Sequence, residues 1–236
     1  VRVINLPDPI WKLGPQNQDG SSFNLKSYRI QSNQPIVAYQ FNPLQNFDVF
    51  SNDASLLLPS NALGKKYWVM TREQSHPAFR GYFTIIAVTP GVTTIKVLAA
   101  APVLAGGGMG QNIPGGTWAG LKTFKLTKGQ VMNVETGING ADFTGSFIDA
   151  DKPVAVFAGS EASNAPRTNK CVKAPGQTQG TCQHQGWTCK SDGDCPVTCC
   201  ADHLEEQLLP IDGWGTTYAA TRSQARGKAK DVWRVL

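Results

Sequence analysis

Short runs of β-branched and aromatic residues, separated by glycine and proline, recur along the chain. Residues 82–100 contain two such runs around a Pro-Gly pair, and in the second run apolar and polar residues alternate as in a half-buried strand. The same two-strand pattern returns at residues 123–136. Residues 35–41 and 153–159 each begin at a proline, which a strand tolerates best at its first position. Since no amphipathic helical pattern exceeds about three turns, the sequence predicts an all-β fold.

Parts of the chain resemble each other. Residues 30–42 (IQSNQPIVAYQFN) are similar to residues 148–160 (IDADKPVAVFAGS) at an offset of 118 positions. Residues 56–69 (LLLPSNALGKKYWV) are similar to residues 207–220 (QLLPIDGWGTTYAA) at an offset of 151 positions. A repeat of this length has the size of a domain rather than of one turn of a solenoid.

The two offsets differ because a cysteine-rich stretch interrupts the second copy. We therefore predict two tandem, related β-sandwich-like units, residues 1–144 and residues 145–236, the second with a disulfide-rich loop insertion at residues 171–200. The chain opens without a leader pattern and ends within an alternation of apolar and polar residues. These features predict a piece of a longer protein in which the second unit is truncated.

All six cysteines lie in this insertion. An even number of cysteines in a short polar stretch predicts local disulfides formed in an oxidising compartment, so we expect an extracellular or cell-surface protein. A zinc site that includes His184 or His203 is the alternative, although the spacing lacks the paired C-x2-C ligands of structural zinc. The sequence leaves the connectivity open. The residues expected to form disulfides are Cys171, Cys182, Cys189, Cys195, Cys199 and Cys200.

A cluster of chemically active side chains follows the last cysteine. Asp202, His203, Glu205 and Glu206 offer a general base with an orienting carboxylate, or ligands for a cation such as calcium. Neither a G-x-S-x-G elbow nor an H-E-x-x-H motif accompanies them. In the repeat alignment they lie opposite the ordinary polar and small residues 51–55. We therefore expect a hydrogen-bond network that fastens the insertion to the following strand, with no cofactor.

The composition and charge of the chain exclude some classes of binding partner. Hydrophobic residues make up 41% of the chain and charged residues 17%, as in a globular protein. The net charge is +5, and the basic residues at 222–234 lack an aromatic stacking platform, so we do not expect nucleic-acid binding. No apolar run approaches the roughly 18 residues of a membrane span. The Gly-rich residues 99–116 lack the spacing of a phosphate-binding loop, and we expect a connecting hairpin or the tip of a binding loop there.

Several of these motifs resemble the IgGFc-binding protein N-terminal domain family, which occurs in animal mucin-like secreted proteins and in bacterial surface proteins. The resemblance implies an extracellular, β-rich, non-enzymatic module of a larger adhesive protein. The Cys-rich insertion is more typical of bacterial members. The motifs that carry the resemblance are SNQPIVAYQFN (32–42), NDASLLLPSNALGKKYWVMT (52–71), KGQVMNVE (128–135), DFTGSFIDADKPVAVFAGS (142–160) and CCADHLEEQLLPIDGWGTTYAAT (199–221).

Together these observations predict a non-enzymatic adhesion or structural module of a larger secreted or cell-surface protein. Its ligand is expected to be a protein or a glycan, held by the loops at 99–116 and 171–200. Open strand edges would allow copies of the chain to assemble with one another. The alternative is a secreted hydrolase or a cation-dependent binding protein that uses Asp202, His203 and Glu206.

Overall fold

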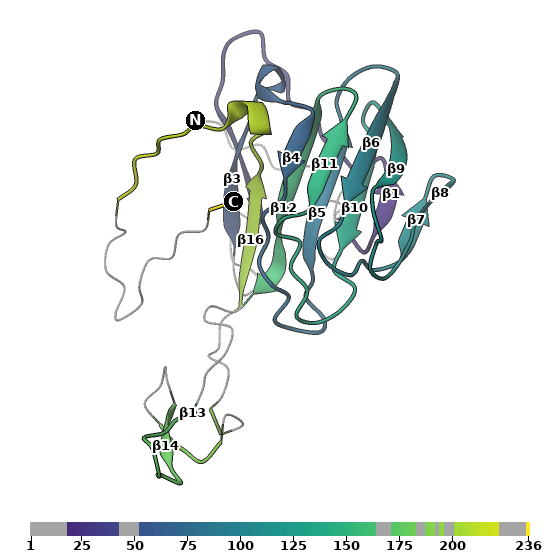
Figure 1. Ribbon diagram of the computed structural model, residues 1–236. Helices are drawn as coiled ribbons and strands as arrows, with labels where there is room; N and C mark the ends of the chain where they lie inside the picture. The colour runs from purple at the N-terminus through teal and green to yellow at the C-terminus, as the bar shows by residue number, and fades with distance from the viewer. Residues whose placement is uncertain are drawn as a thin grey trace, which may run out of the picture.

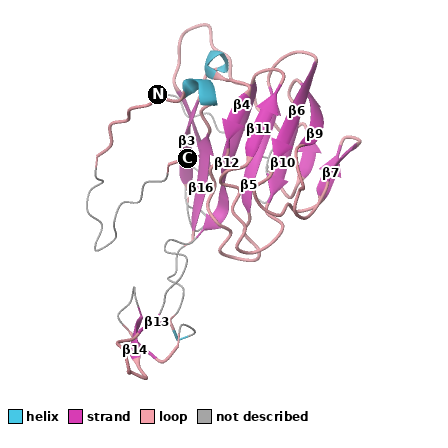
Figure 2. Cartoon of the chain, viewed as in Figure 1, coloured by secondary structure: helices cyan, strands magenta, loops and turns pink. Residues whose placement is uncertain are grey.

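Strands dominate the fold, and the all-β prediction is confirmed. The computed structural model describes residues 18–42, 52–163, 171–182, 187–191, 194–195, 201–221 and 235–236. Figure 1 and Figure 2 show short strands joined by turns, together with the 3-10 turns η1 (Ser60–Ala62) and η3 (Ile211–Gly213). No helix among the described residues has the length and hydropathy needed to cross a membrane.

The strands form two main sheets and two small ones. The seven-stranded sheet has the order β16 (Asp202–Gln207), β12 (Val154–Ser163), β5 (Gly81–Ala87), β10 (Val131–Glu135), β1 (Ser22–Asn24), β7 (Gly106–Gly108) and β8 (Gln111–Ile113). The four-stranded sheet has the order β4 (Lys66–Trp68), β11 (Phe147–Ala150), β6 (Val92–Leu98) and β9 (Lys122–Thr127). A two-stranded sheet pairs β2 (Ala38–Asn42) with β3 (Asp53–Leu57). The fourth sheet lies in the insertion.

One apolar core joins the two main sheets into a sandwich. On β6 every second residue is buried, as expected for a strand with one face on the core and one in water. The strands β5 and β10 are buried on both faces, which fits their central place in the larger sheet. The largest buried side chains of this core include Phe83, Ile85 and Met132 from the larger sheet and Tyr67, Ile95, Leu126 and Ile148 from the smaller one.

Strands from both predicted units share these sheets. β4 of the first predicted unit pairs with β11 of the second, and β5 pairs with β12. The hydroxyl of Tyr67 also donates a hydrogen bond to the carbonyl oxygen of Val154 at 2.7 Å, which ties the two halves across the core. The division into tandem units at residues 1–144 and 145–236 is therefore not confirmed. These strands pair because they pack on one common core, and the internal repeat in the sequence does not indicate which strands pair.

Two hairpins nevertheless follow the sequence similarity. In the β2–β3 hairpin Tyr39 lies opposite Leu56. In the β12–β16 hairpin Phe157 lies opposite Gln207, and these positions are 118 and 151 residues further along the chain. The second strand of each hairpin leads through a proline into a 3-10 turn, η1 or η3. Similar sequences therefore form hairpins with the same register.

The insertion forms a small sheet of its own between β12 and β16 in the chain, and Figure 1 draws this sheet apart from the sandwich. Its strands are β13 (Cys171–Val172), β14 (Gly180–Cys182) and β15 (Thr188–Cys189). Cysteine side chains form its core, and this cluster shares no residue with the core of the sandwich.

Among the described residues, two disulfides close the insertion. They join Cys171 to Cys189 and Cys182 to Cys195. The prediction of disulfides is confirmed for these four cysteines, whereas Cys199 and Cys200 lie outside the described residues. The insertion is thus stabilised by its own cross-links, because so short a segment buries little apolar surface.

Candidate functional site

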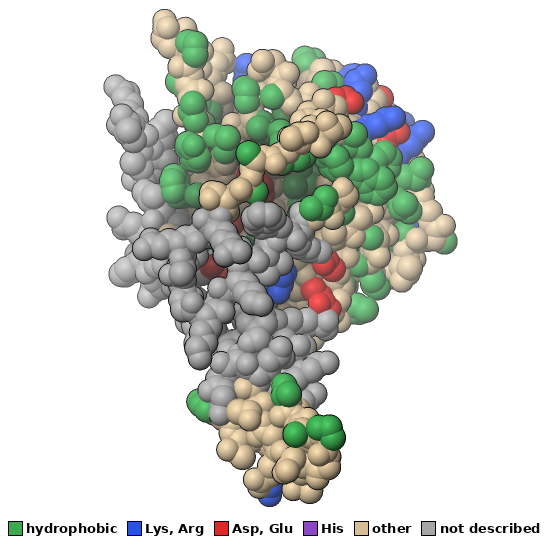
Figure 3. Space-filling model, turned by 60° about the vertical axis from the view of Figure 1, so that its left-hand side comes forward, with side chains coloured by type: hydrophobic (Ala, Val, Ile, Leu, Met, Phe, Trp, Pro, Cys, Tyr) green, Lys and Arg blue, Asp and Glu red, His purple; other side chains and the backbone are tan. Residues whose placement is uncertain are grey.

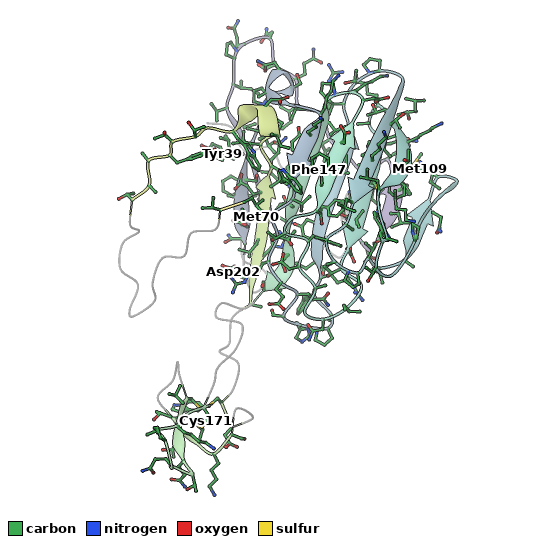
Figure 4. All side chains as sticks on the ribbon, in the orientation of Figure 1. Tyr39, Met70, Met109, Phe147, Cys171 and Asp202 are labelled. Carbon is green, nitrogen blue, oxygen red and sulfur yellow. A yellow bond between two sulfur atoms is a disulfide. The ribbon has the colours of Figure 1, made fainter. Side chains whose placement is uncertain are left out.

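The predicted polar cluster lies on β16, at one edge of the seven-stranded sheet, and Figure 4 labels Asp202 where this strand begins. The side chain of Asp202 is exposed, while His203 and Glu205 are half-buried. The strand alternates between these two environments, so neighbouring members of the cluster point to opposite faces. The cluster is therefore divided between two faces of one strand.

Both ring nitrogens of His203 contact protein groups. Its Nε2 lies 3.1 Å from the side-chain nitrogen of Asn42, and its Nδ1 lies 3.2 Å from the carbonyl oxygen of Glu161. The ring also stacks on Tyr82, with the ring centroids 6.4 Å apart. These contacts hold the histidine between β2 and β12, and they engage both atoms at which it would bind a cation or exchange a proton.

Both carboxylate oxygens of Glu205 accept hydrogen bonds. The side-chain amide of Gln40 donates to Oε1, and the hydroxyl of Tyr82 donates to Oε2 at 2.9 Å. Burial, reinforced by the charge of Glu205, raises the pKa of Tyr82 well above its ordinary value. The tyrosine therefore remains a hydrogen-bond donor at physiological pH.

Side chains of β3 cover the outer edge of β16. The carboxylate of Asp53 accepts a hydrogen bond from the backbone N–H of Glu205 at 2.6 Å, and the hydroxyl oxygen of Ser55 accepts one from the N–H of Gln207 at 2.7 Å. The Ser55 hydroxyl also lies 3.1 Å from Oε1 of Glu206, to which it donates. Unpaired N–H groups at a sheet edge attract other strands, so these contacts protect the edge of β16.

The fastening of the insertion by this cluster stays a prediction, because residues 164–170 and 196–200 lie outside the described residues. In the described residues the contacts of the cluster join β16 to the β2–β3 hairpin, to β5 and to β12. These partners follow from the position of β16, which pairs with β12 on one side and contacts β3 of the two-stranded sheet on the other. The cluster thus fastens one hairpin to another.

A second polar group on the larger sheet is missed by the sequence reasoning. The side chain of Glu135 is 3% exposed, and its carboxylate lies 3.8 Å from Nε of Arg80 and accepts a hydrogen bond from Asn133 at 3.2 Å. Glu161 accepts a hydrogen bond from the backbone N–H of Arg80 at 2.9 Å. The sequence offered one signal for this group, because polar residues stand at the alternate positions 133 and 135 of an otherwise apolar strand.

Burial raises the pKa of Glu135 from 4.5 to about 7, and the nearby carboxylate of Glu161 adds to this shift. The folded protein therefore keeps a proton on Glu135 between these two pH values, whereas the unfolded chain releases it. By linkage, the contribution of Glu135 to the free energy of unfolding falls as the pH rises from 4.5 to about 7, and then levels off. The contribution of this group is at most about 3 kcal/mol.

Replacing Glu135 by glutamine should remove this pH dependence. The amide keeps the shape of the side chain and an oxygen for Asn133, but it does not titrate. We expect Glu135→Gln to flatten the curve of unfolding free energy against pH and to be more stable than the parent at pH 8. Urea titrations across this pH range measure the effect. The exposed Asp212→Asn is the control, and equal slopes for Glu135→Gln and the parent would contradict the prediction.

The described cysteines do not offer a zinc site. The sulfurs of Cys171, Cys189 and Cys195 lie within 4.8 Å of one another, but each belongs to a disulfide and none is a free thiolate. The zinc alternative thus has no support from these residues. His184 lies outside the described residues.

Asp194 belongs to a turn of the insertion. Its Oδ2 accepts hydrogen bonds from the backbone N–H groups of Lys190 at 2.6 Å and Ser191 at 2.8 Å. These hydrogen bonds lower the pKa of Asp194. The carboxylate therefore serves turn formation, which is the usual role of aspartate in such a loop.

The insertion presents apolar side chains to solvent. Trp187 is 60% exposed and Val172 is 58% exposed. Figure 3 shows hydrophobic side chains on the surface of the insertion, away from the main body of the sandwich. The carbonyl oxygen of Trp187 accepts a hydrogen bond from the N–H of Cys182 at 2.7 Å. An exposed tryptophan is a typical anchor for a protein partner.

The Gly-rich residues 99–116 include the β7–β8 hairpin. The sequence predicted a connecting hairpin or the tip of a binding loop there. A Cβ atom on Gly106 would lie 1.7 Å from the carbonyl oxygen of Ser21, so glycine is required where β7 meets β1. Met109, labelled in Figure 4, stands at the hairpin tip with a positive φ of 50°. Gly106 therefore allows β7 to lie against β1, and β7 and β8 form the end of the larger sheet opposite to β16.

Comparison with known proteins gives one match. The model of the family described as IgGFc binding protein matches residues 53–236. No curated protein and no solved structure matches the chain. The matched range includes strands of both main sheets, the insertion and the polar cluster on β16, and it begins after β1 and β2.

Proposed function

The chain belongs to the IgGFc binding protein family, since the family model covers residues 53–236, and we propose that it is a non-enzymatic binding module that acts outside the cell. The module would form part of a larger secreted or cell-surface protein and serve adhesion. Its ligand is a protein, and the Fc part of IgG is the first candidate because the family description names it. A glycan is the alternative ligand.

The insertion is the observation that carries this proposal. It has its own sheet and its own disulfide core, and it exposes Trp187 and Val172. The insertion lies in the chain between β12 and β16, and both of these strands belong to the larger sheet. Binding residues commonly lie on loops that a rigid scaffold positions. The disulfides fit an extracellular environment.

The contacts of His203 and Glu205 do not favour the alternative of a hydrolase. Both nitrogens of His203 engage protein groups, and Glu205 accepts hydrogen bonds from Gln40 and Tyr82. These contacts support a structural role for the cluster. We accordingly propose that binding needs no cofactor, and that a calcium chelator leaves the affinity unchanged.

Replacing Trp187 by alanine tests the proposal. We expect the affinity for immobilised IgG Fc to fall at least about tenfold, because exposed tryptophans at the centre of an interface are often hot spots. The matched control is Trp214→Ala, a substitution of a partly exposed tryptophan on the sandwich, which should leave the affinity within about twofold. Surface plasmon resonance measures both variants. An unchanged affinity for Trp187→Ala, or a parent chain that binds neither Fc nor a glycan panel, would contradict the proposal.

A further inference from the structure

The strand β2 is equivalent to β12 but lacks one of its neighbours in the described part of the chain. Both strands pair with the second strand of their hairpin in the same register, as Tyr39 with Leu56 and Phe157 with Gln207 show. The other edge of β12 is occupied by β5 in antiparallel pairing. In the two-stranded sheet, β2 pairs with β3 alone. The edge of β2 that corresponds to the β5 side of β12 therefore carries no described strand.

This edge has an apolar outer face. Tyr39 is 59% exposed and Phe41 is 51% exposed, and Leu56 on β3 beside them is 42% exposed. The alternate residues Gln40 and Asn42 point the other way, to Glu205 and His203 on β16. Figure 4 labels Tyr39 on the side of the sandwich formed by β2 and β3.

β2 also lacks the devices that keep an edge strand from pairing. Natural edge strands use charged side chains, proline or bulges for this purpose. The strand AYQFN contains neither a charge nor a proline, and its pairing with β3 is regular along its length. The edge of β16, in contrast, is covered by Asp53 and Ser55.

We infer that β2 is the interface at which two copies of the chain associate, with the two β2 strands side by side and antiparallel. The sequence of the strand is self-complementary about Gln40. Antiparallel pairing centred on this residue places Tyr39 opposite Phe41 of the second copy, and Phe41 opposite Tyr39 of the second copy. A twofold interface has this property, because the same patch meets itself. The pairing joins two hairpins into one four-stranded sheet.

The inference goes beyond the proposed function, and its test uses the chain without any ligand. Sedimentation equilibrium of the parent chain, over about 1 to 100 µM, should show a reversible dimer. The double variant Tyr39→Lys/Phe41→Lys places like charges opposite each other and should raise the dissociation constant at least about tenfold. Both side chains are largely exposed, so the variant should keep the melting temperature of the parent.

The matched control replaces two equally exposed apolar residues elsewhere, Leu121→Lys/Ile138→Lys, and should leave the dimer intact. If the lysine variant fails to fold, Tyr39→Ser/Phe41→Ser makes the same comparison. A parent chain that stays monomeric over the whole range overturns the inference. So does a dimer that survives the β2 variants, or one that the control disrupts. Fc binding is measured separately, so failure of one proposal leaves the other testable.

Discussion

Replacing Ile148 by alanine is expected to lower the free energy of unfolding by about 2–5 kcal/mol. Ile148 has no exposed surface, and it lies between Tyr67 and Val97 in the four-stranded sheet. The substitution removes buried methyl groups and leaves a cavity in a core that both halves of the chain share. The sandwich should still unfold in a single cooperative transition, because residues of both halves form one buried cluster.

Guanidinium titration followed by tryptophan fluorescence and by far-UV circular dichroism measures this effect. The control is Val92→Ala on the neighbouring strand β6, where the side chain is 49% exposed and the expected loss is under about 1 kcal/mol. A sandwich that unfolds in two separate transitions, one of which Ile148→Ala leaves unchanged, would contradict a shared core.

Removing one disulfide of the insertion should have a large local effect. The double variant Cys182→Ala/Cys195→Ala opens a loop with a sequence separation of 13 residues, and such a bond typically contributes about 2–4 kcal/mol. We expect the insertion to lose its structure, since its core consists of cysteine side chains. The sandwich should keep its melting temperature, because the two cores share no residue.

Limited proteolysis and calorimetry separate these two effects. Cleavage within residues 171–195 should become rapid in the variant, while the main calorimetric transition stays where it is in the parent. The double variant should also lose affinity for IgG Fc if the insertion binds it. A main transition that falls by several degrees would show that the insertion supports the sandwich, contrary to the expectation.

The strand pattern was predictable from local sequence. The alternation in β6 and the proline-led starts of the segments that form β2 and β12 are visible without any structure. The similarity of residues 30–42 to 148–160 and of residues 56–69 to 207–220 agrees with the shared register of the two hairpins, which the sequence alone did not predict. The alternation within each strand depends on residues close together in the chain, where sequence patterns are informative.

The pairing of distant strands was not predictable in the same way. The tandem-unit hypothesis placed β4 and β11 in different units, yet Tyr67 and Ile148 lie opposite each other in one sheet. Nothing in the local pattern of either strand specifies the other, because many strands of similar length and apolar character could fill the same place. Long-range packing makes this choice.

The candidate site shows the same limit. The residue types at positions 202–206 drew attention to the cluster, but its partners Gln40, Asn42 and Asp53 come from a hairpin near the start of the chain. Glu135 escaped notice because a single glutamate in an apolar strand looks ordinary. Only the fold shows that it is buried beside Arg80.

The affinity of an insertion-free variant for IgG Fc tests most directly whether the insertion is the binding element. Residues 43–52, which connect β2 and β3, would replace residues 164–201, because Ser163 and Asp202 are the paired ends of β12 and β16. We predict that this variant keeps the cooperative unfolding of the sandwich and loses Fc binding. A folded variant that binds Fc with the affinity of the parent would contradict the proposal.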